Sequence, residues 1–185
     1  MDQDELAARI AQARDEGWTT LNLDGSGFGY DEPDEDEIVY LPPEIGNLTG
    51  LTELSLFRNR LTALPPEIGN LTRLRKLGLH GNRLTAVPPE IWNLTALTDL
   101  GLGYNQLTAL PSEIWNLTEL TELYLESNQL TALPLEIGNL ASLSVLNLGY
   151  NELTTLPSEI GNLTGLTYLY LMAIQLTALP SEIGN

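Results

Sequence analysis

The chain has 185 residues, which is long enough for one domain with a sizeable hydrophobic core. Its formal charge of −17 at pH 7 argues against nucleic acid and anionic membrane as partners, because both attract clusters of Lys and Arg. The sequence contains no cysteine, which excludes disulfides, thiolate metal sites and cysteine nucleophiles, and favours a reducing compartment.

Residues 1–17 have the pattern of an amphipathic capping helix. Asp2 and Glu5 have the spacing of a capping box. Leu6 and Ile10 lie on one helix face, and the glycine that ends this range suits a helix C-terminus. We expect this helix to cover leucines that the first strand of the following units would otherwise expose.

No segment has the pattern of a signal peptide or a membrane span. The N-terminus is acidic and lacks an apolar run of signal-peptide length. No stretch approaches the roughly 20 apolar residues that cross a bilayer. We therefore expect a cytoplasmic location, although export by a non-classical route is compatible with the same sequence.

Residues 18–40 have the pattern of a degenerate first repeat with an insertion. The segment WTTLNL alternates as a half-buried strand does. Ser26 and Phe28 occupy positions that hold asparagine and leucine in the later units. Trp18 lies 33 residues before its counterpart Leu51, whereas the later units repeat every 23 residues. The first unit therefore carries about ten additional residues.

The insertion is strongly acidic, with six acidic residues in 31–37. One interpretation is a loop that binds a cation or a partner. The other is a solvated loop close to Arg58, Arg60 and Arg83 in the following turns. We favour the solvated loop, because charge runs are usually solvated and these acids lack the spacing of a calcium loop.

Residues 41–185 consist of a strict 23-residue repeat. In the first copy, Leu54 and Leu56 alternate with Ser55, as expected for a strand that buries one face. Proline then turns the chain, and the EIxNL segment returns as an irregular or 3-10-like turn. Six full copies and a truncated seventh begin at Leu41, Leu64, Val87, Leu110, Leu133, Leu156 and Leu179.

One asparagine recurs at the same position of five copies. We expect these side chains to form a buried ladder that binds the backbone of neighbouring turns, because a buried amide needs hydrogen-bond partners. The expected ladder residues are Asn59, Asn82, Asn105, Asn128 and Asn151.

The pattern LPxEIGNLxxLxxLxLxxNxL resembles the 23-residue class of leucine-rich repeat proteins over 41–185. It is similar to the repeats of Ras-suppressor-type scaffolds, plant intracellular Ras-group proteins and many bacterial proteins. The opening EGWTTLNLDGSGF is similar to the first strand of repeat domains that precede Roc–COR GTPase modules. The expected fold is an α/β repeat solenoid, namely a right-handed superhelix with a concave parallel sheet, an irregular or 3-10 convex side and the N-terminal capping helix.

The residues give little support for an enzyme. His80 is the only histidine, so neither a His-based triad nor a zinc cluster is available. Glu122 and Glu126 point the same way from one strand, but an open sheet offers little of the desolvation that a glycosidase needs. The recurrent glycines follow the repeat and not a phosphate-loop spacing. We expect no catalytic residue, cofactor or metal in this chain.

The outward positions of the strands differ from copy to copy while the frame stays constant, as on a recognition surface. Glycines at 78, 101, 103 and 149 predict a shallow trough in the middle of this face. Tyr, Phe, Met and Arg are residue types enriched at interfaces. The candidate partner-binding residues are Glu53, Phe57, Arg58, Lys76, His80, Tyr104, Tyr124, Glu126, Tyr150, Tyr168, Tyr170 and Met172.

We therefore expect a non-catalytic scaffold that recognises a protein or peptide through its concave face. Two alternatives remain open. The chain would be the recognition arm of a larger signalling or effector enzyme, or it would bind a glycan or small ligand through Tyr124, Glu126, Tyr150 and Tyr170.

The last full copy breaks the pattern, because Ile174 occupies the asparagine position and its neighbours are apolar. Ends of solenoids normally need a polar cap. Three explanations remain: the chain is a fragment of a longer repeat, the apolar end associates with a second copy, or it docks another partner.

Overall fold

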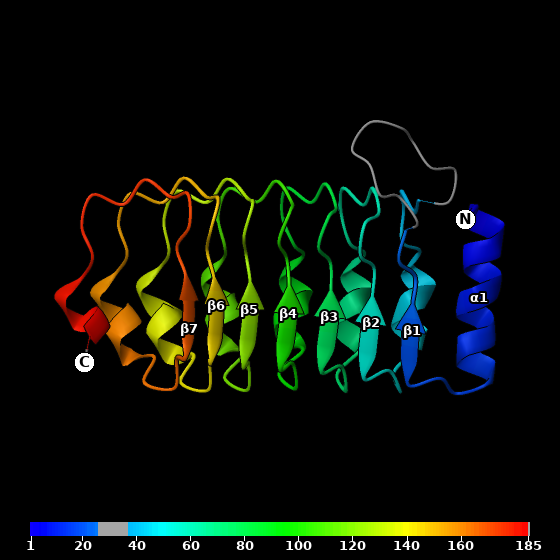
Figure 1. Cartoon of the computed structure of the whole chain (residues 1–185). Helices are drawn as coiled ribbons and strands as arrows, with labels where there is room; N and C mark the ends of the chain where they lie inside the picture. Colours follow the sequence, from blue (N-terminus) through cyan, green and yellow to red (C-terminus); the bar gives the residue numbers. More distant parts are fainter. Residues whose placement is uncertain (26–36, 185) are drawn as a thin grey trace.

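The computed structural model of the chain describes residues 1–25 and 37–184. Helix α1 (Gln3–Asp15) closes one end of the molecule (Figure 1). Asp2 caps it by accepting a hydrogen bond from the Glu5 amide, and the Glu5 carboxylate accepts one from the Asp2 amide. The helix buries Leu6 and Ile10 in the core. The expected capping helix is therefore present.

Seven strands of three residues each form one parallel sheet, in the same order as in the chain. Each later strand pairs with its predecessor at an offset of one repeat, so that Leu54 faces Leu77 and Leu77 faces Leu100. The strands are β1 (Thr20–Asn22), β2 (Glu53–Ser55), β3 (Lys76–Gly78), β4 (Asp99–Gly101), β5 (Glu122–Tyr124), β6 (Val145–Asn147) and β7 (Tyr168–Tyr170).

Short 3-10 helices return the chain on the other side of the sheet (Figure 1). The first six follow an extended proline, whose fixed φ suits the entry to a helical turn and which cannot extend a strand ladder. They are η1 (Pro43–Asn47), η2 (Pro66–Asn70), η3 (Pro89–Asn93), η4 (Ser112–Asn116), η5 (Leu135–Asn139), η6 (Ser158–Asn162) and η7 (Ser181–Gly184).

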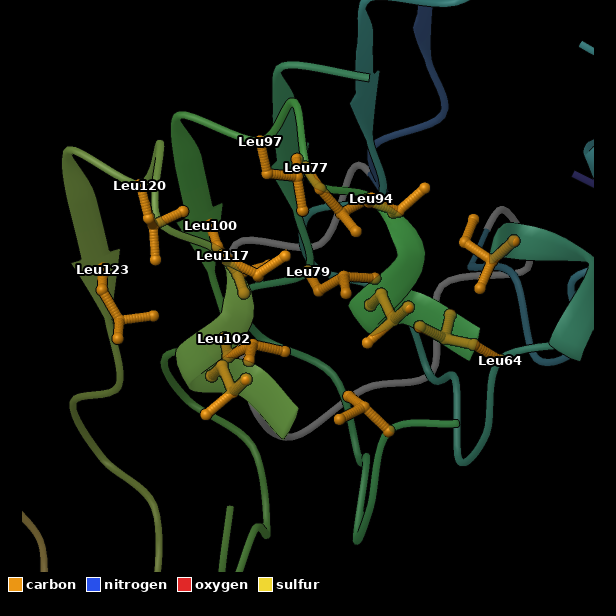
Figure 2. Packing of buried hydrophobic residues seen from close by; sticks show 14 of the residues in the cluster. Leu64, Leu77, Leu79, Leu94, Leu97, Leu100, Leu102, Leu117, Leu120 and Leu123 are labelled. Carbon is orange, nitrogen blue, oxygen red and sulfur yellow. The ribbon is translucent and has the colours of Figure 1, made fainter. Parts of the chain in front are cut away.

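The core is a stack of leucines between the sheet and the 3-10 turns (Figure 2). Leu77, Leu100 and Leu123 occupy the same position in successive strands and are almost fully buried. Burial of one such side chain contributes about 1.5–3 kcal/mol. Because each coil covers the leucines of its neighbour, stability comes from stacking and not from any single repeat.

The expected fold is confirmed: the parallel sheet is curved and does not close on itself. The ten additional residues of the first unit lie between β1 and β2. The two strands still pair in register, with Leu21 opposite Leu54. Ser26, Phe28 and most of the acidic insertion lie outside the described residues. Its last acid is described, and the Glu37 carboxylate forms an ion pair with Arg60.

Candidate partner-binding face

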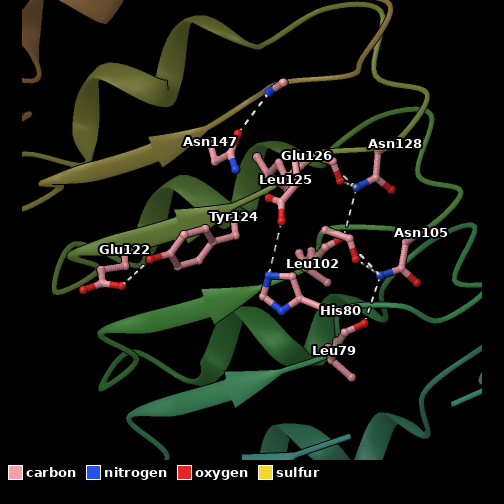
Figure 3. Close-up of polar contacts among 12 residues, drawn as sticks. Leu79, His80, Leu102, Asn105, Glu122, Tyr124, Leu125, Glu126, Asn128 and Asn147 are labelled. Carbon is pink, nitrogen blue, oxygen red and sulfur yellow. Dashed lines mark hydrogen bonds and ion pairs between the residues drawn. The ribbon is translucent and has the colours of Figure 1, made fainter. Parts of the chain in front are cut away.

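Five asparagines form a hydrogen-bonded ladder beside the strands. The Asn105 side-chain oxygen accepts from the Leu84 amide at 3.0 Å, while its nitrogen donates to the carbonyls of Leu79 and Leu102. Each such carbonyl therefore links two coils (Figure 3). Asn59, Asn82, Asn128 and Asn151 make the equivalent bonds.

The ladder ends at Asn151, because the next coil has Ile174 in this position. By the register of the ladder, residue 174 would accept from the Leu153 amide. Leu153 is fully buried, and no acceptor for its N–H occurs in the described part of the chain. The Leu148 carbonyl accepts a hydrogen bond from one ladder asparagine, Asn151, whereas the equivalent carbonyls of the earlier coils accept from two. The last coil is therefore less firmly bonded than the others.

Glycines on β4 and just after it determine how the middle of the concave face is arranged. A Cβ at Gly101 would overlap the His80 ring, and one at Gly103 would lie 2.6 Å from the Glu126 carboxyl carbon. Both side chains therefore fold over β4 from the two sides. They meet there, with 3.7 Å between His80 Nε2 and Glu126 Oε1 (Figure 3). This contact joins side chains from two coils that are not adjacent.

His80 is also the centre of an aromatic group. Its ring centroid lies 6.2 Å from that of Phe57 and 5.7 Å from that of Tyr124. The Arg58 guanidinium lies over the Phe57 ring, 4.9 Å from its centroid. Burial lowers the pKa of His80 below 6.5, and the negative charge of Glu126 opposes that shift. Together with the contact between His80 and Glu126, these contacts place five of the candidate residues in one continuous group.

Tyr124 is held in place by a second carboxylate. Its hydroxyl donates a hydrogen bond of 2.6 Å to Glu122 (Figure 3). This bond to the neutral hydroxyl, together with desolvation and nearby acids, raises the pKa of Tyr124 to about 12. The ring is therefore fixed at the edge of the hollow described next.

An open hollow of about 340 Å³ lies over β1–β4. Gly78, Gly101, His80 and Tyr124 are among the residues that line it. The glycine trough expected from the sequence is therefore only partly present. Glu126 covers Gly103, so the glycines do not form one continuous channel.

Sequence reasoning missed the backbone conformation of the position that precedes each ladder asparagine. Arg58, Tyr104 and Tyr150 have φ between 51° and 55°, a region that disfavours side chains other than those of glycine and asparagine. Only Gly81 satisfies this requirement without strain. Tyr104 and Tyr150 are nevertheless exposed, so the fold itself does not require their rings. The sequence offered one signal of this conformation, namely Gly81, which occupies a position that holds different residues in the other copies.

The last coil exposes a patch of apolar side chains. The Tyr168 and Tyr170 rings stack with 6.2 Å between centroids, and Met172 is 64% exposed. Leu179 and Ile183 are exposed on the following turn. The strand leucines of this coil are only partly buried, unlike those of the earlier strands. Tyr168, Tyr170 and Met172 therefore lie together, on β7 and just after it, away from the His80 group.

Comparison with family models matched residues 66–148 and 112–185 to a leucine-rich repeat region and residues 50–71 to a single leucine-rich repeat. A comparison with curated proteins found no match. Among residues 1–25 and 37–184, every helix is too short or too polar for a transmembrane segment.

Several solved structures are similar to the chain. A leucine-rich repeat protein of Leptospira interrogans is 30% identical, with a TM-score of 0.66 over 98% of this chain and 60% of its own. An internalin of Listeria monocytogenes is 28% identical, with a TM-score of 0.71 over 86% of this chain and 43% of its own. A plant peptide hormone receptor, solved with RGF2, is 33% identical, with a TM-score of 0.71 over 80% and 25%.

The chain spans less than two thirds of each of these three proteins. The matched leucine-rich repeat region covers residues 66–185, more than half of the chain, and contains β3–β7 and η2–η7. The chain belongs to the leucine-rich repeat family.

Proposed function

We propose that the chain is a non-catalytic scaffold that binds a protein or peptide through its concave face. The observation that carries this proposal is the convergence of Phe57, His80, Tyr124 and Glu126 beside an open hollow. These side chains come from three coils of a rigid frame, so they offer a preformed surface with little rotamer entropy to lose. The similar plant receptor was solved with RGF2 bound, which supports the same use of the fold.

The charges on this face indicate the chemistry of the partner. Asp99 and Glu122 lie opposite each other on β4 and β5, so their like charges repel. Asp99 also lies opposite Lys76 on β3, whereas Glu122 lies opposite Val145 on β6 and has no basic residue at either paired position. The sequence has no Lys or Arg after Arg83, so no basic residue follows in later coils. A basic group of a partner would relieve this repulsion, and Tyr124 offers it an aromatic face.

The apolar side chains on β7 define a second contact. Two strand spacings separate β5 from β7, and Tyr170 is in register with Tyr124, two residues further along the strand than Glu122. The spacing from Glu122 to Tyr170 is therefore about 12 Å. Side chains of an extended peptide alternate between its two faces, so a basic residue and an apolar residue four positions apart, about 13 Å, would contact Glu122 and Tyr170 together. A salt-sensitive interaction of this kind differs from glycan stacking, which depends little on salt.

The β7 patch also favours self-association as a second function. Tyr168, Tyr170 and Met172 form an exposed apolar group of the type that marks contacts between proteins. Strand β7 pairs only with β6 within residues 37–184, so its other edge offers backbone groups to a second chain.

The experiment is selection of displayed random dodecapeptides on the immobilised protein, followed by measurement of Kd for the strongest synthetic peptide. Asp99→Asn with Glu122→Gln should weaken binding at least tenfold, and added salt should weaken binding to the wild type. The matched control is Glu44→Gln with Glu136→Gln, which removes two exposed carboxylates from the 3-10 turns. Equal loss in both double variants, or peptides that bind only the convex side, would contradict the proposal.

A further inference from the structure

Two coils differ from the rest at one convex position. The 3-10 turns η1, η2, η5 and η6 carry glycine in the EIGN segment, whereas η3 and η4 carry Trp92 and Trp115. Both indoles are almost completely buried, with 5% and 1% of their surface exposed. The tryptophans therefore lie inside the convex layer and do not project into solvent.

The glycine copies show what this position normally does. A Cβ on Gly46 would lie 2.6 Å from the Glu67 carbonyl oxygen, and one on Gly69 would lie 2.5 Å from that of Glu90. The following turn therefore packs directly against the glycine backbone. Any larger side chain at this position forces the next turn to move away, because these contacts are with backbone atoms.

The turns that follow the tryptophans are indeed less closely packed. Turn η4 contacts η3 less extensively than η2 contacts η1, and η5 contacts η4 less extensively than η6 contacts η5. The indole nitrogens of Trp92 and Trp115 have no hydrogen-bond partner among the described residues. Buried indole N–H groups usually find such a partner, so these positions favour ring volume over polar satisfaction.

A spacer on one side of the solenoid changes its curvature. Backbone hydrogen bonds hold neighbouring strands about 4.8 Å apart, so the concave layer does not expand when the convex layer does. Strand β4 lies between η3 and η4 in the chain, and β5 lies between η4 and η5. The extra bend therefore falls at β4 and β5, and it tilts the concave side chains on either side of it toward one another.

This is the place where side chains from different coils meet. His80 follows β3 and Glu126 follows β5, and they approach within 3.7 Å over Gly101 of β4 and Gly103, which follows it (Figure 3). These two glycines provide the room, and the convex tryptophans provide the bend. We propose that Trp92 and Trp115 are positioning residues, that is, wedges that curve the sheet at β4 and β5 and so hold His80 and Glu126 in contact across the recognition face.

The purpose of the wedges rests on the proposed function, but their geometry is testable without a partner. The chain has no cysteine, so pairs of spin labels can be placed cleanly. Asn70→Cys with Asn162→Cys reports the convex distance from η2 to η6, and Lys76→Cys with Tyr168→Cys reports the concave distance from β3 to β7. All four positions are exposed.

The convex and concave distances, measured by pulsed electron–electron double resonance, should change in opposite directions. In the variant Trp92→Gly with Trp115→Gly, the convex distance should shorten by about 7 Å, since an aromatic ring occupies about 3.5 Å of contact distance in each gap. The concave distance should lengthen. Each single variant should give about half of the convex change, which keeps the test available if the double variant folds poorly.

The control is Trp92→Phe with Trp115→Phe, which keeps an aromatic spacer and removes the unpaired indole N–H. It should retain both wild-type distances. Unchanged distances in the glycine variants would overturn the proposal, and so would a Phe variant that shortens as much as the glycine variant, because ring volume would then not be the cause.

The effect of the tryptophans on the recognition face can be measured separately from the distances. His80 is the only histidine, so its imidazole signals can be followed by NMR through a pH titration. In the double glycine variant its pKa should rise toward 6.5, because loss of burial outweighs loss of Glu126. The affinity for the selected dodecapeptide should fall at least tenfold, and the Phe variant should keep it.

The possible failures are distinguishable. If the distances change while the His80 pKa and the peptide affinity do not, the tryptophans bend the solenoid without positioning the face, and the proposal is wrong while the proposed function stands. If the wild-type chain binds no peptide on its concave side, the proposed function fails, and the distance and NMR results still decide whether Trp92 and Trp115 act as wedges.

Discussion

Replacing Asn105 with leucine should lower the free energy of unfolding by about 1–3 kcal/mol. The side chain accepts a hydrogen bond from the Leu84 amide, which is fully buried and has no other acceptor in the described residues. Its two principal donor bonds are less critical, because the Leu79 carbonyl keeps its bond from Asn82. The expected loss therefore comes mainly from one orphaned N–H group.

The opposite change provides the matched control. Ile174→Asn should place an acceptor near the buried Leu153 amide and continue the ladder by one coil. It should raise the free energy of unfolding by about 0.5–1.5 kcal/mol. Equilibrium urea unfolding of both variants, followed by circular dichroism, measures the two values. An Asn105→Leu variant as stable as the wild type would refute the ladder reasoning.

Three further predictions concern single groups. Glu122→Gln should lower the pKa of Tyr124 from about 12, because the charged acceptor of its hydroxyl is lost. Ultraviolet titration of tyrosinate measures this pKa. An unchanged pKa in the variant would show that the hydrogen bond does not form. The pKa of His80 is lower in the folded chain than in the unfolded chain, so the folded state favours the neutral imidazole. The contribution of His80 to the free energy of unfolding should therefore be complete above pH 6.5 and lost as pH falls toward the folded pKa. Urea unfolding of the wild type and of His80→Gln between pH 5 and 8 tests this sign. The free energy of unfolding of the wild type minus that of the variant should decrease as pH falls, and an increase would contradict the prediction. Tyr170→Ala with Met172→Ser should leave stability nearly unchanged and abolish any self-association in sedimentation velocity, and an oligomer that survives the change would exclude the β7 patch as its interface.

Much of the fold follows from the repeat, because each leucine has the same role in every coil. The inward direction of Leu54 and Leu56, the 3-10 returns and the capping helix are all consequences of local pattern. The residues of the asparagine ladder were identifiable for the same reason. Regularity of this kind makes neighbouring coils predictable from one copy.

The recognition face was less predictable, because its arrangement depends on side chains that meet across coils. Nothing within one repeat indicates that His80 reaches over β4 to Glu126, since the contact depends on glycine in the coil between them. The left-handed conformation of Tyr104 is similarly a property of the turn and not of tyrosine. Departures from the repeat, such as Trp92 in place of glycine, are the positions that carry this information.

The most direct test of the proposed recognition face is hydrogen–deuterium exchange of the protein with and without the selected dodecapeptide, resolved by mass spectrometry. Protection should appear in peptides that contain β3–β5 and the residues around His80 and Glu126, with no change in η1–η6. Protection confined to the 3-10 turns would contradict the account and place the binding surface on the convex side.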